Sequence, residues 1–293
     1  YAISAIINIF SVVIVINYIF SRLSSKSDLR IIFDFLAGAG IILAILGLFE
    51  AAFTEIARIE VTSANPNYYG LSLGICYICL ATSNTYKYKT ILLIVIALAL
   101  ILSGSRTVLF APILFHVWKS FITFGVLRTI FTSLMLAIPL LVLTVFFDLR
   151  VLKPFEADTS NAERLLITRV AVDMTMDNPL VGIGWGRFFS EWPNYTKFTY
   201  ETTLNDGSKF FLFTDRARVT HNDFLKVSSE LGLLALLFFI AMSLTVLRQS
   251  ALVRETTLFG LFPILLTLII FSMTHNNLNS FVFWFFFLMP GLK

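Results

Sequence analysis

The sequence predicts an all-α polytopic membrane protein with one large outer loop, and three observations support this fold class. The chain is 57% hydrophobic and only 14% charged, whereas soluble domains carry about 25% charged residues. Apolar runs, most of them long enough to contribute a membrane helix, alternate with short polar turns along most of the chain. A single long polar stretch, 148–224, interrupts this pattern.

The apolar runs lie at about 2–20, 31–53, 67–83, 90–103, 106–118, 122–147, 225–247, 257–274 and 280–292. They predict three regions: N-terminal transmembrane helices at 1–147, a large periplasmic or extracellular loop at 148–224, and C-terminal transmembrane helices at 225–293. Because Tyr1 already lies within an apolar run, we expect the chain to start partway through its natural sequence.

The distribution of Lys and Arg predicts the side of the membrane on which each loop lies. One set of alternate loops carries nine basic residues, namely Arg22, Lys26, Arg30, Lys87, Lys89, Lys119, Arg248, Arg254 and Lys293. The opposite short loops carry only Arg58 and Arg106. Short cytoplasmic loops are enriched in Lys and Arg, so the first side is predicted to be cytoplasmic and the loop at 148–224 to lie outside.

Arg106, in "LSGSRTVLF", interrupts the apolar sequence. The flanking runs of about 13–14 residues reach roughly 20 Å of a core of about 30 Å. The turn is therefore expected in a recess open to the outside. Small residues at 103–105 would let a ligand approach, and an intramembrane arginine predicts an anion site. The alternative is an arginine that snorkels to the outer headgroups.

The outer loop predicts an amphipathic helix from about Asn161 to Asp177. Ser160 and Glu163 have capping-box spacing, and Pro179 disfavours helix at the residue before it. Two faces are predicted, a polar one and an apolar one: Arg164, Thr168, Ala171 and Thr175 against Ile167, Val170 and Met174. We expect this helix on or in the membrane surface, with its polar face over the recess. A solvated or headgroup-facing position for Arg164 and Arg169 is the alternative.

Two further segments of the outer loop predict local structure. "GIGWGRF" at 182–188 is similar to a glycine-rich phosphate loop, but no strand precedes it, so a tight turn is favoured. The segment 194–220 alternates polar and aromatic residues around "NDGS", which predicts a small β-hairpin.

His221, in "THNDFLKVSSELG", stands at the outer mouth of the seventh apolar run. Histidine can take a proton from a hydroxyl near neutral pH, so His221 is the candidate catalytic base. The alternative is an interfacial helix cap, with Asn222 and Asp223 supplying the capping oxygens. A hydrolase built from Ser105, His221 and Asp223 is a second alternative, although an arginine beside the serine favours an anionic substrate.

No metal site and no cofactor are predicted, because no carboxylate–histidine cluster has ligand spacing. The net charge of +4 forms no basic tract, so nucleic acid is not a predicted partner. Arg106, Arg164 and His221 are expected to converge on one outer pocket. Two cations and a base beside lipid suggest a lipid pyrophosphate as leaving group and a hydroxyl as attacking group. The outer face has no ATP supply, so the energy for any synthesis must arrive within the substrate. A polyprenyl-pyrophosphate-linked sugar meets that requirement.

Three segments, "LSGSRTVLF", "NAERLLITRVAVDMTMDNPLVGIGWGRF" and "THNDFLKVSSELGLLALL", occur in this order around the outer loop. In this arrangement the chain resembles the bacterial O-antigen ligase/polymerase family over roughly residues 90–247. That family includes O-antigen ligases, surface-polysaccharide polymerases and protein O-oligosaccharyltransferases. Its members usually carry more helices than the nine runs found here.

The resemblance implies a GT-C-like helical bundle in the bacterial inner membrane, with the large loop in the periplasm. It implies an inverting glycosyltransferase with an undecaprenyl-pyrophosphate-linked glycan donor, a glycan or lipid A-core acceptor, no metal and no cofactor. Arg106 and Arg164 match the family's pyrophosphate-binding arginines, and His221 matches its histidine. Arg169 matches no family position, and Asn222 and Ser105 complete the candidate site as neighbours. A flippase or transporter of the lipid-linked glycan is the alternative, although no internal repeat supports it.

Overall fold

A computed structural model describes residues 11–12, 14–21, 26–53, 59, 61, 65–131, 133–135, 159–196, 200–203, 209–212, 219–253 and 258–291. This part of the chain is helical apart from one two-stranded hairpin, which confirms the predicted all-α membrane fold. The chain divides into two compact units. The first unit comprises 1–20, 154–248 and 269–293, and the second comprises 21–153 and 249–268.

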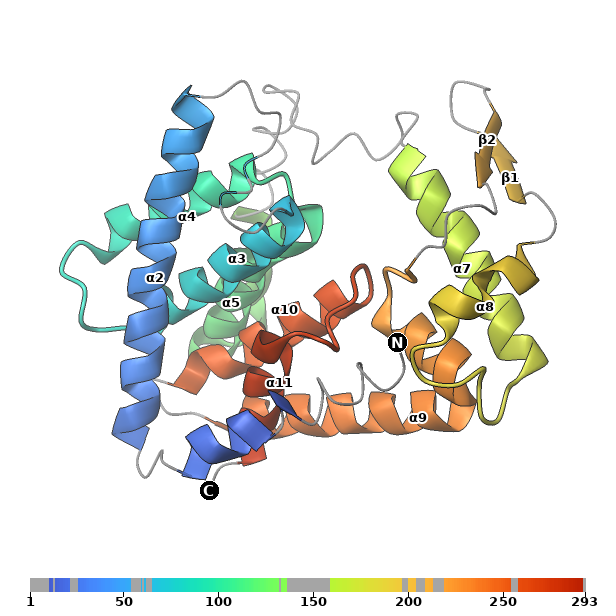
Figure 1. The fold of residues 1–293 in the computed structure, drawn as a ribbon. Helices are drawn as coiled ribbons and strands as arrows, with labels where there is room; N and C mark the ends of the chain where they lie inside the picture. Colours follow the sequence, from blue (N-terminus) through green and yellow to red (C-terminus); the bar gives the residue numbers. More distant parts are fainter. Residues whose placement is uncertain are drawn as a thin grey trace. The chain divides into compact units, whose positions relative to one another are not determined.

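The elements follow one another along the chain as labelled in Figure 1. The α-helices are α2 (Lys26–Phe53), α3 (Pro66–Thr82), α4 (Lys89–Leu102), α5 (Arg106–Phe124), α7 (Thr159–Asp177), α8 (Phe188–Tyr195), α9 (Asp223–Leu252), α10 (Leu261–Ser272) and α11 (Phe281–Leu288). Strands β1 (Tyr200–Thr203) and β2 (Lys209–Leu212) pair antiparallel, and 3-10 helices lie at η2 (Leu258–Gly260) and η3 (Met289–Gly291). The hairpin confirms the prediction for 194–220.

Among the described residues, three helices are long and apolar enough to cross a membrane: Asp28–Phe53, Thr107–Phe124 and Asp223–Leu252. Shorter apolar helices cover Lys89–Leu102, Val126–Met135 and Leu258–Ser272. The predicted run at 67–83 corresponds to α3, which has 17 residues. Most of the predicted run at 2–20, and residues 136–147 of the run at 122–147, lie outside the described residues.

Helix α3 is the centre of the second unit, where it contacts α2, α4 and α5. It begins with Pro66 at its first position, and Asn65 Oδ1 accepts the N–H of Asn67 at 2.9 Å. Proline at the first position and asparagine at the cap are typical of a helix start. Most of α3 is buried, including the free cysteines Cys76 and Cys79, as expected for a helix packed on several sides.

Helix α5 is longer than the apolar run at 106–118 predicts. It continues past Lys119 to Phe124 and ends before Gly125, which has φ 78°. Lys119 is exposed, so its charge stays outside the packed core and does not end the helix. The 19 residues of α5 reach about 28 Å at 1.5 Å per residue. The expectation of two short runs beside Arg106 is therefore confirmed for α4 and wrong for α5.

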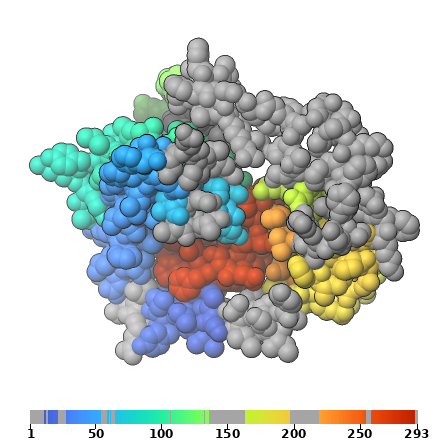
Figure 2. All heavy atoms as spheres, turned by 45° about the horizontal axis from the view of Figure 1, so that its top comes forward, coloured from blue at the N-terminus to red at the C-terminus, as the bar shows by residue number. Residues whose placement is uncertain are grey.

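In the first unit, α7 packs against α8 through one apolar cluster. Its fully or nearly fully buried members are Leu166, Ile167, Val170, Ala171, Met174, Phe188 and Trp192. Figure 1 shows α7 and α8 beside each other, with the hairpin next to α7. Elsewhere in this unit, the rings of Phe20 and Phe285 lie 5.5 Å apart. Figure 2 shows blue N-terminal residues beside red C-terminal ones.

The packing of α7 corrects two expectations. The helix begins at Thr159, so Ser160 lies in its first turn rather than at its cap. Its predicted apolar face of Ile167, Val170 and Met174 is buried against α8, so this face is not available to a membrane surface. The predicted polar face is also partly buried, because Thr175 is 7% exposed and donates to Ser228 Oγ of α9 at 3.2 Å. The predicted end at Asp177 is confirmed.

Candidate functional site

The turn that carries Arg106 is packed closely against α3. Ser103 and Ser105 are buried, and Gly104 between them has φ 62°. A Cβ on Gly70 of α3 would lie 2.8 Å from the Ser105 Cβ. The small residues of this turn therefore accommodate α3. Packing against α3 explains these small residues without the predicted approach of a ligand.

Arg106 is the first residue of α5, and Ser105 is the residue before the helix. The N–H groups of Val108 and Leu109 both donate to the Ser105 carbonyl, at 3.2 Å each. The N-terminus of a helix carries a partial positive charge and favours anions. The fold thus places a permanently charged residue at the positive end of a 19-residue helix.

His221 lies two residues before α9 and has a left-handed backbone, with φ 48°. Few non-glycine residues adopt this conformation, although histidine is enriched among them. Asn222 Oδ1 accepts the N–H of Leu225 at 3.1 Å, so Asn222 caps α9. The predicted capping role is confirmed for Asn222. It is wrong for Asp223, whose carboxylate binds another segment of the chain.

Hydrogen bonds on both sides of His221 connect this segment to the loop after α10. The Thr220 hydroxyl donates to Asn276 Oδ1 at 2.9 Å. Asp223 Oδ2 accepts the backbone N–H groups of Asn277 at 2.6 Å and Leu278 at 3.1 Å. The histidine is thus flanked by two attachments to one loop.

These contacts argue against a serine hydrolase. The Asp223 carboxylate binds the backbone N–H groups of Asn277 and Leu278 and the Ser272 hydroxyl, so it holds the loop after α10 rather than orienting an imidazole as a catalytic triad requires. The buried Ser105 hydroxyl makes no hydrogen bond within the described part of the chain. Neither end of the supposed triad is in place.

Arg164 and Arg169 lie on α7 and differ in burial. Arg164 is half-buried, whereas Arg169 is exposed. Helix α7 contacts the start of α9 through the Thr175–Ser228 hydrogen bond, and Leu225 packs on the α7–α8 cluster. The helix of Arg164 and the segment of His221 therefore pack together in the first unit. Arg106 belongs to the second unit, and the convergence of all three residues stays a prediction.

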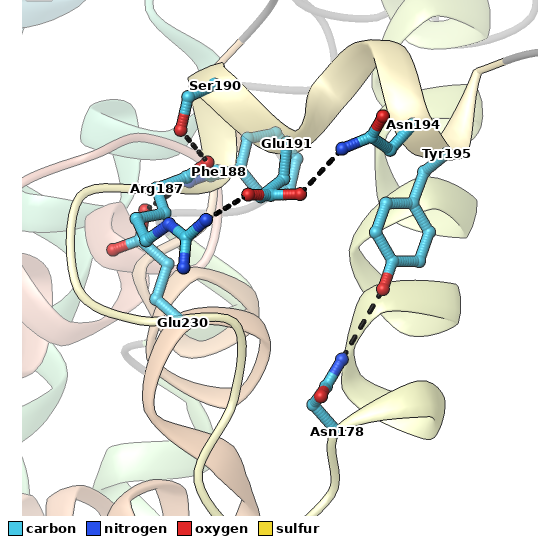
Figure 3. Close-up of polar contacts among 8 residues, drawn as sticks. All are labelled: Asn178, Arg187, Phe188, Ser190, Glu191, Asn194, Tyr195 and Glu230. Atoms are coloured by element: carbon cyan, nitrogen blue, oxygen red, sulfur yellow. Dashed lines mark hydrogen bonds and ion pairs between the residues drawn. The ribbon is translucent and has the colours of Figure 1, made fainter.

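The glycine-rich segment 182–188 wraps around an internal carboxylate (Figure 3). Glu230 is 2% exposed and accepts the N–H groups of Gly186 at 2.9 Å and Phe188 at 3.1 Å. The N–H of Gly184 donates to the Glu230 carbonyl at 2.9 Å. The amides that could have bound a phosphate are therefore occupied within the protein, which confirms a tight turn in place of a phosphate loop.

Two glycines make this packing possible. Gly232 has φ 86° and kinks α9, and a Cβ there would lie 2.3 Å from the Leu180 carbonyl oxygen. Gly182 has φ 63°, and its Cβ would lie 2.3 Å from the Glu230 carbonyl carbon. The segment thus packs directly on the backbone of α9, about two and a half to three turns after His221.

Next to this turn, a series of polar contacts runs along α8. Arg187 forms an ion pair with Glu191, which also accepts from Asn194 Nδ2 at 2.8 Å (Figure 3). Arg187 is largely exposed. It therefore provides a structural arginine for comparison with the candidate site.

Sequence reasoning missed Glu230 and the part that the loop after α10 plays at His221. Glu230 had a usable signal, since an acidic residue inside an apolar span is rare and marks a structural or functional site. The loop at 274–280 had none, because its neutral polar residues form no motif. Among the described residues, no three His, Cys, Asp or Glu side chains gather at a possible metal site, and the expectation of metal-free chemistry stays a prediction.

Comparison with known protein families identifies one family for this chain. A family profile described as O-antigen ligase matches residues 91–240, just over half of the 293-residue chain. No curated protein matches the chain. The matched range includes the Arg106 turn, α7, the Glu230 turn and His221. The chain therefore belongs to the O-antigen ligase family and is a membrane protein with a glycan-transferring, glycosyltransferase-like function.

Proposed function

We propose that this protein is an inverting, metal-independent glycosyltransferase. It moves a glycan from an undecaprenyl-pyrophosphate carrier to a hydroxyl acceptor on the outer face of the bacterial inner membrane. The acceptor is either a growing glycan, as in a polymerase, or a lipid A-core sugar, as in a ligase. The reaction uses neither a nucleotide nor a cofactor.

The position of Arg106 at the start of α5 carries this proposal. A guanidinium presents a planar set of donors that suits phosphate oxygens and stays charged at physiological pH. The helix N-terminus adds a fixed positive potential at the same place. Together they favour an anion that gains charge during the reaction, as a departing pyrophosphate does.

In the proposed reaction, His221 takes the proton of the acceptor hydroxyl. The hydroxyl oxygen forms a bond to the anomeric carbon while the bond from that carbon to the pyrophosphate oxygen breaks. The bonding electrons leave with the lipid pyrophosphate, where Arg106 and Arg164 stabilise the added charge. A single displacement inverts the anomeric configuration. Histidine suits the role of base because its ordinary pKa lies near neutrality.

The first test uses cells that lack the native gene and express single variants. Arg106→Ala and His221→Ala should each abolish the surface glycan, since loss of such groups lowers turnover by about 100-fold or more. Arg106→Lys should retain part of the activity, because it keeps the charge and loses the planar fork. The measurement is the glycan profile on gels, beside the amount of membrane-inserted protein.

Arg187→Ala is the matched control, because this exposed arginine is engaged with Glu191. It should leave the glycan profile unchanged. A normal glycan length and yield in His221→Ala would remove His221 as the base. In the deletion strain, a single-repeat product identifies a polymerase, whereas uncapped core with intact lipid-linked polymer identifies a ligase.

A further inference from the structure

We propose that the loop Met273–Ser280, between α10 and α11, is a clasp that holds His221 in its catalytic position. Thr220, Asp223 and Asn276 are its positioning residues. This inference rests on the proposed role of His221 as the base. It adds a function for a neutral segment that the sequence did not connect with the site.

The clasp binds the chain on both sides of His221. Thr220, the residue before it, donates to Asn276 Oδ1 at 2.9 Å. Asp223, two residues after it, accepts two backbone N–H groups of the same loop. Thr220 and Asp223 are 3% and 0% exposed. Buried hydrogen bonds are shielded from competing water, so both attachments restrict the backbone between them.

The backbone of His221 needs such restraint. Its φ of 48° lies in the left-handed region, which costs an L-residue on the order of 1 kcal/mol or more. Such a conformation persists where the surrounding structure over-determines it. The Asn222 cap fixes the start of α9, and the clasp fixes the residues on either side. A catalytic residue must be held in one position, and the restraints on both sides of His221 meet this requirement.

The loop itself is held at several points. The His275 ring stacks on Phe271 with centroids 4.2 Å apart and lies 2.9 Å from the Thr274 hydroxyl. Trp284 Nε1 donates to the Leu278 carbonyl at 2.6 Å, and the N–H of Ser280 donates to the Asn277 carbonyl at 2.8 Å. These contacts tie the clasp to the helices before and after it. It can therefore act as a fixed support for His221.

The chemistry explains why position matters here. A general base must lie within hydrogen-bond reach of the proton it removes, and a misplacement of 1 Å can lower the rate by about 100-fold. The binding of the donor depends on the arginines and should be affected little. Loosening the clasp should therefore lower kcat and leave the KM for the donor unchanged.

The test compares two substitutions of Thr220 in the purified full-length protein. Thr220→Val keeps the shape and removes the hydroxyl, whereas Thr220→Ser keeps the hydroxyl that Asn276 accepts. We expect Thr220→Val to lower kcat by about 10- to 100-fold with an unchanged donor KM. Thr220→Ser should restore kcat to near the wild-type value. Transfer is measured with a lipid-pyrophosphate-linked glycan and normalised to the number of donor-binding sites, which removes any loss of folded protein.

A double-mutant cycle identifies the contact. Asn276→Leu should reproduce the effect of Thr220→Val, and the double variant should be no worse than either single one. Val219→Ala is the control next to Thr220, because the Val219 side chain is exposed and lies outside the clasp. It should leave kcat unchanged.

Two results would overturn the clasp. One is a wild-type kcat per donor-binding site in Thr220→Val, and the other is a fall that Thr220→Ser does not reverse. The failure of the proposed function looks different: His221→Ala itself would then retain transfer. An inactive His221→Ala beside a fully active Thr220→Val would reject the clasp and leave the proposed base in place.

Discussion

Glu230 is a buried carboxylate in an apolar helix, and its two oxygens each accept one backbone N–H from the turn at 182–188. Burying a charge is unfavourable unless hydrogen bonds compensate for it. The same hydrogen bonds also stabilise the turn, because its N–H groups at Gly186 and Phe188 would otherwise lack acceptors. Glu230 therefore joins the segment after α7 to the helix that follows His221.

Removal of this carboxylate should destabilise the protein. Glu230→Ala leaves the N–H groups of Gly186 and Phe188 without acceptors, at about 1–3 kcal/mol for each group. Glu230→Gln keeps one carbonyl oxygen and should be intermediate. The measurement is the thermal unfolding midpoint of the purified protein in detergent.

Glu191→Gln provides the matched control, since Glu191 pairs with the exposed Arg187. A pair of this kind contributes about 0–1 kcal/mol, so the midpoint should move little. Equal midpoints for Glu230→Ala and Glu191→Gln would show that the Glu230 hydrogen bonds do not stabilise the fold.

At the scale of elements, local signals predicted some helix boundaries but not the partners against which the helices pack. The end of α7 followed from Pro179, and the hairpin from the turn residues around "NDGS". The extension of α5 past Lys119 was missed, because a long charged side chain can leave an apolar helix without ending it. The burial of the α7 faces was also missed. Periodicity shows which residues share a face, but the partner of that face, here α8 and α9, depends on tertiary contacts.

The contact between α3 and the Arg106 turn leads to a prediction for one glycine. In Gly70→Ala the new Cβ would lie 2.8 Å from the Ser105 Cβ, so the turn must shift and transfer should fall by about 10-fold or more. Alanine favours helix over glycine by about 1 kcal/mol, so a loss cannot come from helix propensity. The measurement is transfer by the purified variant.

Ser72→Ala is the control for this change, because Ser72 lies on the exposed side of the same helix. It should transfer at the wild-type rate. Full activity of Gly70→Ala would mean that the position of the turn is not critical. The small residues at 103–105 would then not be needed for the function of Arg106.

At the scale of the whole molecule, the proposed reaction draws on both units. Arg106 belongs to the second unit, and Arg164 and His221 belong to the first. The chemical types of these residues could be predicted from the sequence, because an arginine in an apolar segment and a histidine at the end of a span are visible as letters. The residues that pack around each of them and hold it in place could not be predicted from the sequence. Gly70, Glu230 and Asn276 are remote in sequence from the residues they contact.

The most direct measurement is transfer by the purified protein in detergent, with donor binding measured on the same samples. The donor is an undecaprenyl-pyrophosphate-linked glycan, and the buffer contains EDTA and no nucleotide. Wild-type protein should release undecaprenyl pyrophosphate and transferred glycan in equal amounts. Arg106→Ala and Arg164→Ala should lose donor binding, whereas His221→Ala should bind the donor and transfer nothing. Unimpaired transfer in either arginine variant would contradict one shared site for the three residues. Donor binding by wild-type protein with no transfer to any acceptor would contradict the proposed glycosyltransferase.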